Sequence, residues 1–453
     1  MTIPELVALQ RQAFMLNHPY SVEERVEALE LLREGILRRE QEIYQALEQD
    51  LGKSPGEAYM TEIGMVLSEL SYAVKHLHQW AAPKRVKTPL AQFPSRSFIF
   101  KEPYGVVLIM APWNYPFQLT LAPFIGALAA GNHCILKPSN YSPATSGVIF
   151  DLIAECFPVE RAAVILGGRE ENQTLLDQRF DYIFFTGGVN VGRIVLEKAA
   201  RYLTPVSLEL GGKSPCIVDD SADIPVAARR IAFGKALNAG QTCVAPDYLL
   251  VQEKVKDRLL AEIKKCWQTF YGDALSSPQW PRMVNEKHYR RVMELLSQEK
   301  IYCGGQGDGQ RIAPTLLTDV RWDAPIMQQE IFGPVLPVIS FRRIEEVVPL
   351  INAREKPLAL YLFSRRHAAQ ELILDKVPFG GGCVNDTIIH LASDRLPFGG
   401  VGNSGMGGYH GKYSFDTFTH EKSVVSKANW LDLPVRYAPF SQKKLRIIKK
   451  LMK

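Results

Sequence analysis

The sequence predicts an α/β protein built on two parallel sheets, and three observations support this. Four apolar runs after position 104 lack polar alternation, as strands buried on both faces of a sheet do; they lie at 105–110, 134–137, 163–166 and 182–185. Helical stretches separate these runs, and strand–helix–strand order predicts a parallel sheet covered by helices. A second series follows at 216–218, 248–251, 335–338 and 358–361. We therefore expect two α/β domains that meet near 207–212.

The length and the first hundred residues complete this expectation. At 453 residues the chain exceeds the roughly 250–300 residues that one hydrophobic core usually supports. From 21 to 78, apolar residues such as Val26, Leu29 and Leu32 recur every three or four positions, which predicts amphipathic helices. Between 83 and 103, prolines interrupt an alternating pattern, which predicts a strand or the arm of a hairpin.

Composition and charge argue against several classes of protein. A hydrophobic content of 46% with 22% charged residues is typical of a globular protein. The net charge of +5 is small for this length, so we expect no nucleic-acid partner, which would require a concentrated basic stripe. The seven cysteines include no CxxC pair and predict no disulfide framework. Because the N-terminal segment is charged and no run of about 18 apolar residues occurs, the sequence predicts a cytoplasmic protein.

One dense basic segment closes the chain at 443–453. Leu445, Ile448 and Leu451 recur at helical spacing among lysines and Arg446, which predicts a basic amphipathic helix. Such a helix could lie on an anionic membrane surface. We favour the alternative, a surface helix packed on its own protein, because basic residues also suit the C-terminal end of a helix dipole.

A glycine-rich turn follows the fourth apolar run. The run 182–185 leads into Gly187, Gly188 and Gly192, and we expect a helix at 191–201. Bare backbone N–H groups at a helix N-terminus suit a pyrophosphate. The spacing departs from G-x-G-x-x-G, so the segment alone is equally compatible with a plain turn.

Glu209 lies about twenty residues after this turn, where a dinucleotide site often has an acid that binds ribose. Strand alternation places Glu209 on the face opposite Leu208 and Leu210, directly before a glycine pair, and this position competes with the ribose role. The Gly-Lys-Ser at 212–214 is not a phosphate-binding P-loop, because that motif requires glycine where Ser207 stands.

Cys243 lies in a segment of small and polar residues, Asn-Ala-Gly-Gln-Thr-Cys-Val-Ala-Pro. Cys134 and Cys216, in contrast, lie in apolar runs that are typical of buried structural thiols. A nucleophile requires access and a lowered thiol pKa, so the pattern favours a reactive thiol at Cys243. No histidine lies near it in the sequence, which leaves a Cys–His pair open. His76 and His78 would point apart on a helix, so we predict no metal site.

Two polar residues follow buried strands. Asn114 comes after the run 105–110, where a side-chain amide could donate to a developing oxyanion; a turn-forming role is an equal alternative. Lys137 directly follows Ile135 and Leu136, at a strand end where phosphate or ribose could lie. Those apolar neighbours argue against the alternative of an exposed surface lysine.

Seven motifs in this order resemble the aldehyde dehydrogenase superfamily, over nearly the whole chain. They are PWNYP at 112–116, LKPS at 136–139, FTG at 185–187, LELGGK at 208–213, GQTC at 240–243, EIFGP at 330–334 and PFGG at 397–400. The short N-terminus, APDY at 245–248 and GNSGMGGYHG at 402–411 resemble the class 3 branch, which includes fatty-aldehyde dehydrogenases.

The resemblance implies two Rossmann-like domains and a small β arm for oligomerisation, and hence a homodimer. It divides the chain into a cofactor-binding domain at 1–81 and 101–208, a catalytic domain at 209–392, an arm at 82–100 and 393–430, and a basic tail at 431–453. The implied cofactor is NAD or NADP. The implied substrate is a small-molecule aldehyde, which is oxidised to its carboxylic acid.

The resemblance also assigns catalytic roles. Cys243 would attack the aldehyde carbon as a thiolate, and Asn114 with the Cys243 backbone N–H would stabilise the oxyanion of the thiohemiacetal. Hydride would then pass to the nicotinamide. Glu209 would deprotonate the water that hydrolyses the remaining thioester, a task that requires a carboxylate tuned towards neutrality.

Around the cofactor, the resemblance places Lys137 and Glu330 at ribose hydroxyls, Phe332 near the nicotinamide, and the residues from Gly187 to Gly192 at the pyrophosphate. These assignments give roles to the glycine turn and to Lys137, whose functions the local sequence alone did not decide.

Two positions depart from the family pattern. Asn140 stands where the family often has glutamate, whose carboxylate would bind the adenine-ribose hydroxyls and repel the 2′-phosphate of NADP. We therefore predict appreciable use of NADP. Gly188 replaces a frequent serine, which puts one hydroxyl contact near the pyrophosphate in doubt.

No arginine stands beside the site motifs, so nothing indicates an acidic semialdehyde. Tyr115, Leu119 and Phe398 instead predict an apolar pocket, and with it a medium or long aliphatic or an aromatic aldehyde.

Two alternative functions remain. A coenzyme-A-acylating enzyme is disfavoured by Glu209, because that branch does not need a general base there. A catalytically inactive binding protein of the same fold is disfavoured by the intact catalytic residues.

Overall fold

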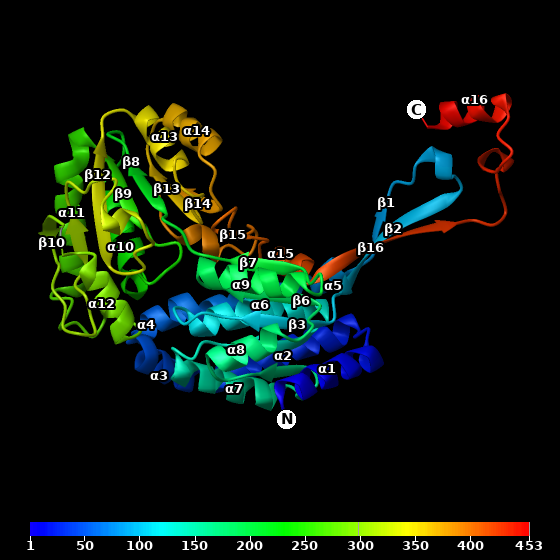
Figure 1. Cartoon of the computed structure of the whole chain (residues 1–453), viewed down its shortest axis with the longest axis horizontal. Helices are drawn as coiled ribbons and strands as arrows, with labels where there is room; N and C mark the ends of the chain where they lie inside the picture. The colour runs from blue at the N-terminus through cyan, green and yellow to red at the C-terminus, as the bar shows by residue number, and fades with distance from the viewer. Residues whose placement is uncertain (298, 453) are drawn as a thin grey trace.

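Three sheets organise the protein. The computed structural model describes residues 1–297 and 299–452. A six-stranded and a seven-stranded sheet each lie within an α/β domain, and a three-stranded sheet stands away from both domains (Figure 1). This arrangement confirms the predicted class of two parallel-sheet domains and a small β arm.

The six-stranded sheet is the centre of the first domain. Its strands, in spatial order, are β15 (Gly405–Met406), β7 (Val206–Glu209), β6 (Tyr182–Thr186), β3 (Val106–Met110), β4 (His133–Lys137) and β5 (Ala162–Val164). All pairs are parallel except β15 with β7. Every residue of β3, β4 and β6 is buried, as their lack of polar alternation predicted.

Helices from before and between these strands complete the first domain. They are α1 (Ile3–Asn17), α2 (Val22–Arg38), α3 (Glu40–Leu51), α4 (Pro55–Ala58), the π turn η1 (Tyr59–Ile63), α5 (Gly64–Ala81), α6 (Pro116–Ala130), α7 (Pro143–Cys156), α8 (Arg169–Leu176), α9 (Val189–Ala200) and α15 (Lys412–Thr417). The buried apolar residues of α2 and α5 include Leu29, Leu32 and Leu70, so the three-and-four spacing did predict the packed face.

The seven-stranded sheet is the centre of the second domain. Its strands, in spatial order, are β10 (Ile301–Cys303), β11 (Thr315–Leu317), β12 (Val335–Phe341), β9 (Tyr248–Gln252), β8 (Pro215–Val218), β13 (Ala359–Phe363) and β14 (Gly381–Val384). Only the pair of β10 with β11 is antiparallel. The chain passes from the first sheet to this one between Glu209 and Pro215.

Helices and short turns connect these strands. The helices are α10 (Ile224–Ala236), α11 (Lys256–Tyr271), α12 (Glu286–Glu294), α13 (Val347–Asn352) and α14 (His367–Lys376). The short turns are η3 (Leu237–Gly240), η4 (Glu253–Val255), η5 (Pro325–Met327), η6 (Ile344–Glu346) and η7 (Ile389–Ala392). The turn η3 follows α10 directly and leads to Cys243, so it positions the reactive segment.

The arm is the antiparallel sheet of β1 (Lys84–Val86), β2 (Ser95–Pro103) and β16 (Thr419–Lys427), with the turn η2 (Leu90–Gln92) between its first two strands. The structure corrects its expected limits. Strand β2 continues past residue 100, and within 393–430 the strand β15 pairs with β7 while α15 packs on α6. That part of the segment therefore belongs to the first domain, and β16 alone completes the arm.

The C-terminal helix α16 (Gln442–Leu451) lies beyond the arm, away from both domains (Figure 1). None of its residues is buried, and its chief contact is the neighbouring turn η8 (Pro434–Arg436). The interpretation that we favoured, a helix packed on its own protein, is therefore wrong. Lys453, the last residue of the predicted basic tail, lies outside the described residues.

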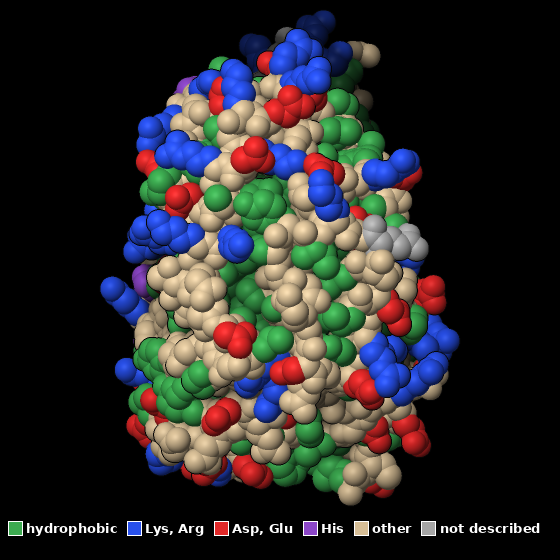
Figure 2. Space-filling model, turned by 90° about the vertical axis from the view of Figure 1, so that its left-hand side faces the viewer, with side chains coloured by type: hydrophobic (Ala, Val, Ile, Leu, Met, Phe, Trp, Pro, Cys, Tyr) green, Lys and Arg blue, Asp and Glu red, His purple; other side chains and the backbone are tan. Residues whose placement is uncertain are grey.

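Charges of both signs are interspersed on the face shown in Figure 2, so they offset one another over that surface. Over residues 1–297 and 299–452, no helix combines the length and the apolar character that a membrane crossing requires.

Candidate active site

Cys243 follows a turn of left-handed backbone. Asn238, Ala239 and Gly240 have φ angles of 52°, 51° and 72°. At Gly240 a Cβ would lie 2.3 Å from the carbonyl oxygen of Gly333, so the approach of the two backbones requires glycine. This contact brings the GQTC and EIFGP motifs together, and it holds the cysteine segment in a conformation that L-residues rarely adopt.

The thiol of Cys243 contributes to the wall of an apolar pocket. Burial raises its pKa to about 12, and the charges of Glu330 and Glu209 add to the shift. The expectation of a lowered thiol pKa is therefore wrong for this structure. Cys243 rests as the thiol, and its proton must leave before the sulfur can attack.

Glu209 ends strand β7 and is only 2% exposed. Neither carboxylate oxygen has a hydrogen-bond partner, and burial raises its pKa well above the usual value. A Cβ at Gly399 would lie 3.2 Å from Oε1, so the PFGG motif passes beside this carboxyl group. A buried acid without a partner destabilises a fold, which makes Glu209 a candidate for function.

Asn114 lies in the segment between β3 and α6 and is buried. Its side-chain amide donates to the carbonyl of Gln241 at 3.0 Å, two residues before Cys243. A primary amide carries two N–H donors, so this bond leaves one N–H available for an oxyanion. The structure thus brings Asn114 to the cysteine segment, although 129 residues separate them in the sequence.

The pocket has a cavity volume of about 160 Å³. Tyr115, Leu119 and Phe398, the three residues predicted for it, all line its wall with Cys243. The Tyr115 hydroxyl makes a 2.6 Å hydrogen bond with Oγ1 of Thr242, which ties the wall to the cysteine segment. Among the described lining residues there is no lysine, arginine, aspartate or glutamate, so this pocket suits an apolar molecule.

Sequence reasoning missed most of the pocket wall. The further lining residues come from η1, α5, α10, η3 and from η7 with the residue before it, and include Met60, Met65, Phe233, Leu237, Ile388, Ile389 and Leu391. The exposed Met60 and Ile389, at 48% and 56%, were weak signals, because exposed apolar side chains often mark a binding surface. Nothing in their local sequence separates them from ordinary core residues.

The start of α9 fits a pyrophosphate. Gly188 caps this helix without any side-chain hydrogen bond, and a Cβ there would meet nothing within 4 Å. The Oγ1 of the preceding Thr186 is buried without a partner. Gly192 packs so closely on Leu210 that a Cβ would lie 2.7 Å from it. Unpartnered donors and open space at a helix N-terminus are what a phosphate group requires.

Lys137 and Asn140 lie at and just beyond the end of β4. The Lys137 ammonium donates to the carbonyls of Pro138 at 2.8 Å and Gly167 at 2.7 Å, and burial lowers its pKa to about 8. Asn140 is exposed, and its amide nitrogen lies 3.1 Å from where a Cβ of Gly168 would stand. Both residues therefore sit at the carboxyl edge of the sheet, where a nucleotide binds in such folds.

Glu330 and Phe332 approach the site from the second domain. The Oε1 of Glu330 is buried without a partner. Burial is the main cause that raises the pKa of Glu330 to about 8, and the negative charge of Asp247 is the second. Phe332 has a φ of 50°, and its ring stands edge-on to Trp113 with the centroids 5.4 Å apart. An acid with one free oxygen and an aromatic wall fit the hydroxyls and the ring of a dinucleotide. The predicted cofactor residues Lys137, Gly187 and Glu330 thus come from both domains.

The fold and the site define a two-domain α/β enzyme with a pocket cysteine, an unpartnered buried acid and a helix N-terminus that suits a pyrophosphate. The chain belongs to the aldehyde dehydrogenase family, whose family model matches residues 2–424. A 4,4′-diaponeurosporen-aldehyde dehydrogenase of Staphylococcus aureus is 52% identical over 424 residues, 92% of each chain. Aldehyde dehydrogenase family 3 member B1 of Mus musculus is 44% identical, covering 97% of this chain and 95% of its own.

A solved structure of Staphylococcus aureus AldH in its substrate-bound state is also similar, with a TM-score of 0.98, 49% identity and complete coverage of both chains. The protein is therefore an aldehyde dehydrogenase of the class 3-like branch that uses NAD or NADP.

Proposed function

We propose that the protein oxidises medium or long aliphatic or aromatic aldehydes to carboxylic acids through a thioester on Cys243. One observation carries this proposal: an apolar pocket includes Cys243 and Phe398 in its wall, and the unpartnered carboxyl group of Glu209 lies beside Gly399, the residue after Phe398. The apolar pocket, the nucleophile Cys243 and the base Glu209 thus form a single proposed site.

The proposed reaction begins when the Cys243 thiol gives its proton to water and the resulting thiolate sulfur bonds to the aldehyde carbon. Asn114 and the Cys243 backbone N–H donate to the resulting oxyanion. When bound, NAD(P)⁺ would supply the hydride acceptor beside this carbon. Collapse of the oxyanion would then expel the hydride and leave an acyl group on the sulfur in the same step. Glu209 takes a proton from water, the hydroxide attacks the thioester, and the acid leaves as the thiolate is restored.

Water is the proposed acceptor of the acyl group, rather than coenzyme A. Glu209 supports this, because transfer to a thiol such as coenzyme A would not require a base that activates water. Product analysis with and without coenzyme A separates the two reactions. The free acid is expected in both cases.

The pocket wall predicts a strong preference among aldehydes. Decanal, hexanal and benzaldehyde bury apolar surface in the pocket, and each buried methylene contributes about 0.8 kcal/mol. Succinic semialdehyde brings a carboxylate to a wall that has no lysine or arginine among its described residues. We expect its kcat/KM to be roughly a hundredfold or more below that of decanal. A steady-state panel with both cofactors tests this, and a preference for succinic semialdehyde would contradict the proposed substrate class.

Asn140 predicts appreciable use of NADP. Its amide is neutral, so it lacks the charge that would repel a 2′-phosphate. We expect Asn140→Glu to lower kcat/KM with NADP roughly tenfold or more while the value with NAD changes little. The ratio of the two values in each protein is the measurement. A strong preference for NAD that Asn140→Glu leaves unchanged would contradict the role of Asn140.

We propose a cytoplasmic homodimer in which the arm contacts the partner. The arm supports this proposal because its two outer strands, β1 and β16, are largely exposed and have free edges, and a small sheet that packs on nothing else is only marginally stable. All seven cysteines are free thiols, which supports a reducing compartment. A mass in solution near twice that of one chain is expected in analytical ultracentrifugation.

We also propose that α16 contacts anionic membrane surfaces. The apolar side chains of Leu445 and Ile447 in this helix are 40% and 42% exposed. Its charged residues, which include Arg446, are all cationic, because no acidic residue occurs between 433 and 452. Such a helix binds through its apolar face and its charge together. We expect deletion of 441–453 to lower binding to phosphatidylglycerol vesicles roughly tenfold or more, with decanal oxidation in solution unchanged. Equal pelleting of the two proteins would contradict this contact.

A further inference from the structure

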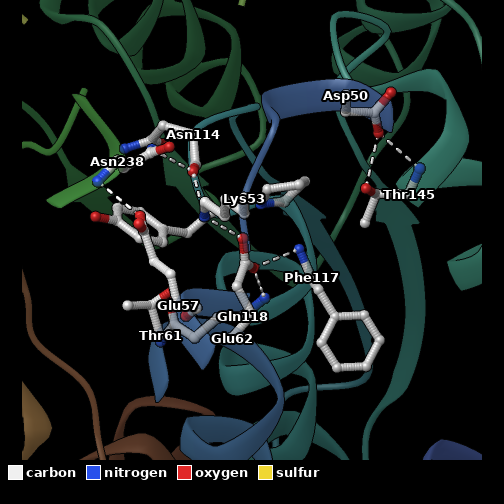
Figure 3. Close-up of polar contacts among 12 residues, drawn as sticks. Asp50, Lys53, Glu57, Thr61, Glu62, Asn114, Phe117, Gln118, Thr145 and Asn238 are labelled. Carbon is white, nitrogen blue, oxygen red and sulfur yellow. Dashed lines mark hydrogen bonds and ion pairs between the residues drawn. The ribbon is translucent and has the colours of Figure 1, made fainter. Parts of the chain in front are cut away.

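A cluster of three buried charged residues lies beside the loops that carry Asn114 and Cys243. It consists of Lys53, Glu57 and Glu62, and Figure 3 shows their polar contacts. The side chains of Lys53 and Glu62 have no exposed surface, and Glu57 is 9% exposed. None of the three appeared in any sequence motif, and the proposed reaction uses none of them.

The local backbone conformation explains how the carboxyl groups of Glu57 and Glu62 both lie near Lys53. Glu57 lies in α4 and Glu62 in the π turn η1, five residues apart. In a regular α-helix, residues five apart lie about 140° apart around the axis. The wider π turn reduces this angle, and such turns are frequent at functional sites. Both carboxyl groups can therefore face Lys53.

Lys53 contacts the segment that carries the oxyanion donor. Its Nζ donates to Oε1 of Glu62 at 2.6 Å and to the backbone carbonyl of Asn114 at 3.1 Å. It also lies 4.0 Å from the ring centroid of Tyr115, within the range of a cation–π contact. Since the Tyr115 hydroxyl bonds to Thr242, this ammonium supports both sides of the site.

Glu57 contacts the turn that carries the nucleophile. Its Oε1 accepts from the backbone N–H of Asn238 at 2.7 Å, the first residue of the left-handed turn before Cys243. The Asn238 side chain then donates to the backbone carbonyls of Asn114 at 2.7 Å and Gln241 at 3.1 Å. Glu57 thus holds the residue that joins the two catalytic loops.

Glu62 holds the start of the helix that follows Asn114. Its Oε2 accepts from the backbone N–H groups of Phe117 at 3.0 Å and Gln118 at 2.9 Å, which are free donors at the N-terminus of α6. With Lys53 as a third donor, Glu62 accepts three hydrogen bonds, whereas Glu57 accepts one. Burial raises the pKa of both acids, that of Glu57 to about 7.

We propose that Lys53, Glu57 and Glu62 are positioning residues that hold the Asn114 loop against the Cys243 loop in the geometry that hydride transfer requires. This inference rests on the proposed function, because it assumes that Cys243 attacks and Asn114 binds the oxyanion. Replacing a buried ion pair by apolar residues is often neutral or stabilising, so stability alone does not account for this cluster. A role in geometry does, because small misplacements of reacting groups slow a reaction strongly.

The test compares two substitutions of Glu57 in the full chain. Glu57→Gln keeps an oxygen that accepts from Asn238, whereas Glu57→Ala removes it. We expect Glu57→Ala to slow the NADH burst and kcat roughly ten- to a hundredfold with decanal, with KM changed by less than about threefold. Glu57→Gln should restore most of the burst rate.

Asp50 provides a matched control. Its carboxylate also caps a helix start, because it accepts from the backbone N–H groups of Ala144 at 3.2 Å and Thr145 at 2.8 Å. Figure 3 shows the contact with Thr145. The helix α7 leads into neither catalytic loop. Asp50→Ala, which removes this cap, should lower the thermal midpoint and leave the burst rate near wild type. An equal fall of the burst rate in Asp50→Ala and Glu57→Ala would overturn the proposal, since a general loss of stability would then explain both.

Should Glu57→Ala fail to fold, the double variant Lys53→Met with Glu62→Gln carries the same test. It removes both charges together, keeps an acceptor for α6 and deletes the donor to Asn114, so the same fall in burst rate with a steady KM is expected. A folded Glu57→Ala, or a folded double variant in its place, that retains the wild-type burst overturns the positioning role while Cys243→Ala is inactive. If Cys243→Ala itself remains active, the proposed function fails first, and the inference fails with it.

Discussion

Cys243→Ala is expected to abolish aldehyde oxidation, with kcat lowered roughly 10⁴-fold or more, because no other group in the pocket can form the thioester. The pocket and the cofactor cleft should remain intact, since the substitution removes one sulfur from a loop that the left-handed turn at Asn238 fixes. Steady-state NADH formation with decanal measures the loss, and a cofactor titration by fluorescence shows that binding persists.

Cys303→Ala is the matched control for this substitution. Cys303 is another partly buried free thiol, on β10 of the second domain, outside the pocket wall. Its loss should leave kcat near the wild-type value. Turnover of decanal by Cys243→Ala at a rate similar to Cys303→Ala would mean that the reaction does not pass through this sulfur.

Glu209→Gln is expected to separate the two halves of the reaction. The amide cannot take a proton from water, so hydrolysis of the thioester should slow roughly 10²- to 10⁴-fold. Formation of the thioester does not need the base in the proposed scheme, so one equivalent of NADH should still appear in a rapid burst. Stopped-flow absorbance with decanal measures both phases, and a proportional loss of burst and steady rate would contradict this division of roles.

The raised pKa of Glu209 also predicts how pH acts on the enzyme. Only the ionised carboxylate can act as a base, so wild-type kcat should rise with pH through the pKa of this group. Stability should change in the opposite direction. Because the folded state holds the proton more tightly than the unfolded chain, folding loses stability as pH rises above the ordinary glutamate value of 4.5. Glu209→Gln should therefore raise the thermal midpoint more at pH 8 than at pH 5.

Much of the fold could be predicted from the sequence because its signals are local. Strands β3, β4 and β6 are buried on both faces, so their apolar runs carry no polar alternation, and that pattern survives without knowledge of neighbours. The limits of the arm could not be predicted in the same way. Strand β15 is two residues long, and only its pairing with β7 shows that its segment belongs to the first domain.

The candidate site shows the same difference between features with a local sequence signal and features that depend on distant residues. Cys243, Glu209 and Asn114 stand in short motifs with unusual local composition, so they could be found without coordinates. The thiol pKa could not, because burial and two distant acids, Glu209 and Glu330, determine it. The positioning residues Lys53 and Glu57 were also missed, since their partners lie 61 and 181 positions away and no local pattern distinguishes them from surface charges.

The α16 helix shows a different limit. Its amphipathic pattern predicted a helix correctly, but a pattern of apolar and basic residues does not say what the apolar side contacts. The structure places this helix beyond the arm and away from both domains. The apolar side of the helix therefore does not pack against the core of either domain.

The central claim is a covalent bond between one sulfur and the carbonyl carbon, and it can be measured directly. Glu209→Gln is mixed with decanal and NAD, quenched during the burst, digested and analysed by mass spectrometry. The account predicts about one decanoyl group per chain, on the peptide that contains Cys243, in step with the NADH formed. NADH released without an acylated Cys243, or with the acyl group on another side chain, would contradict it.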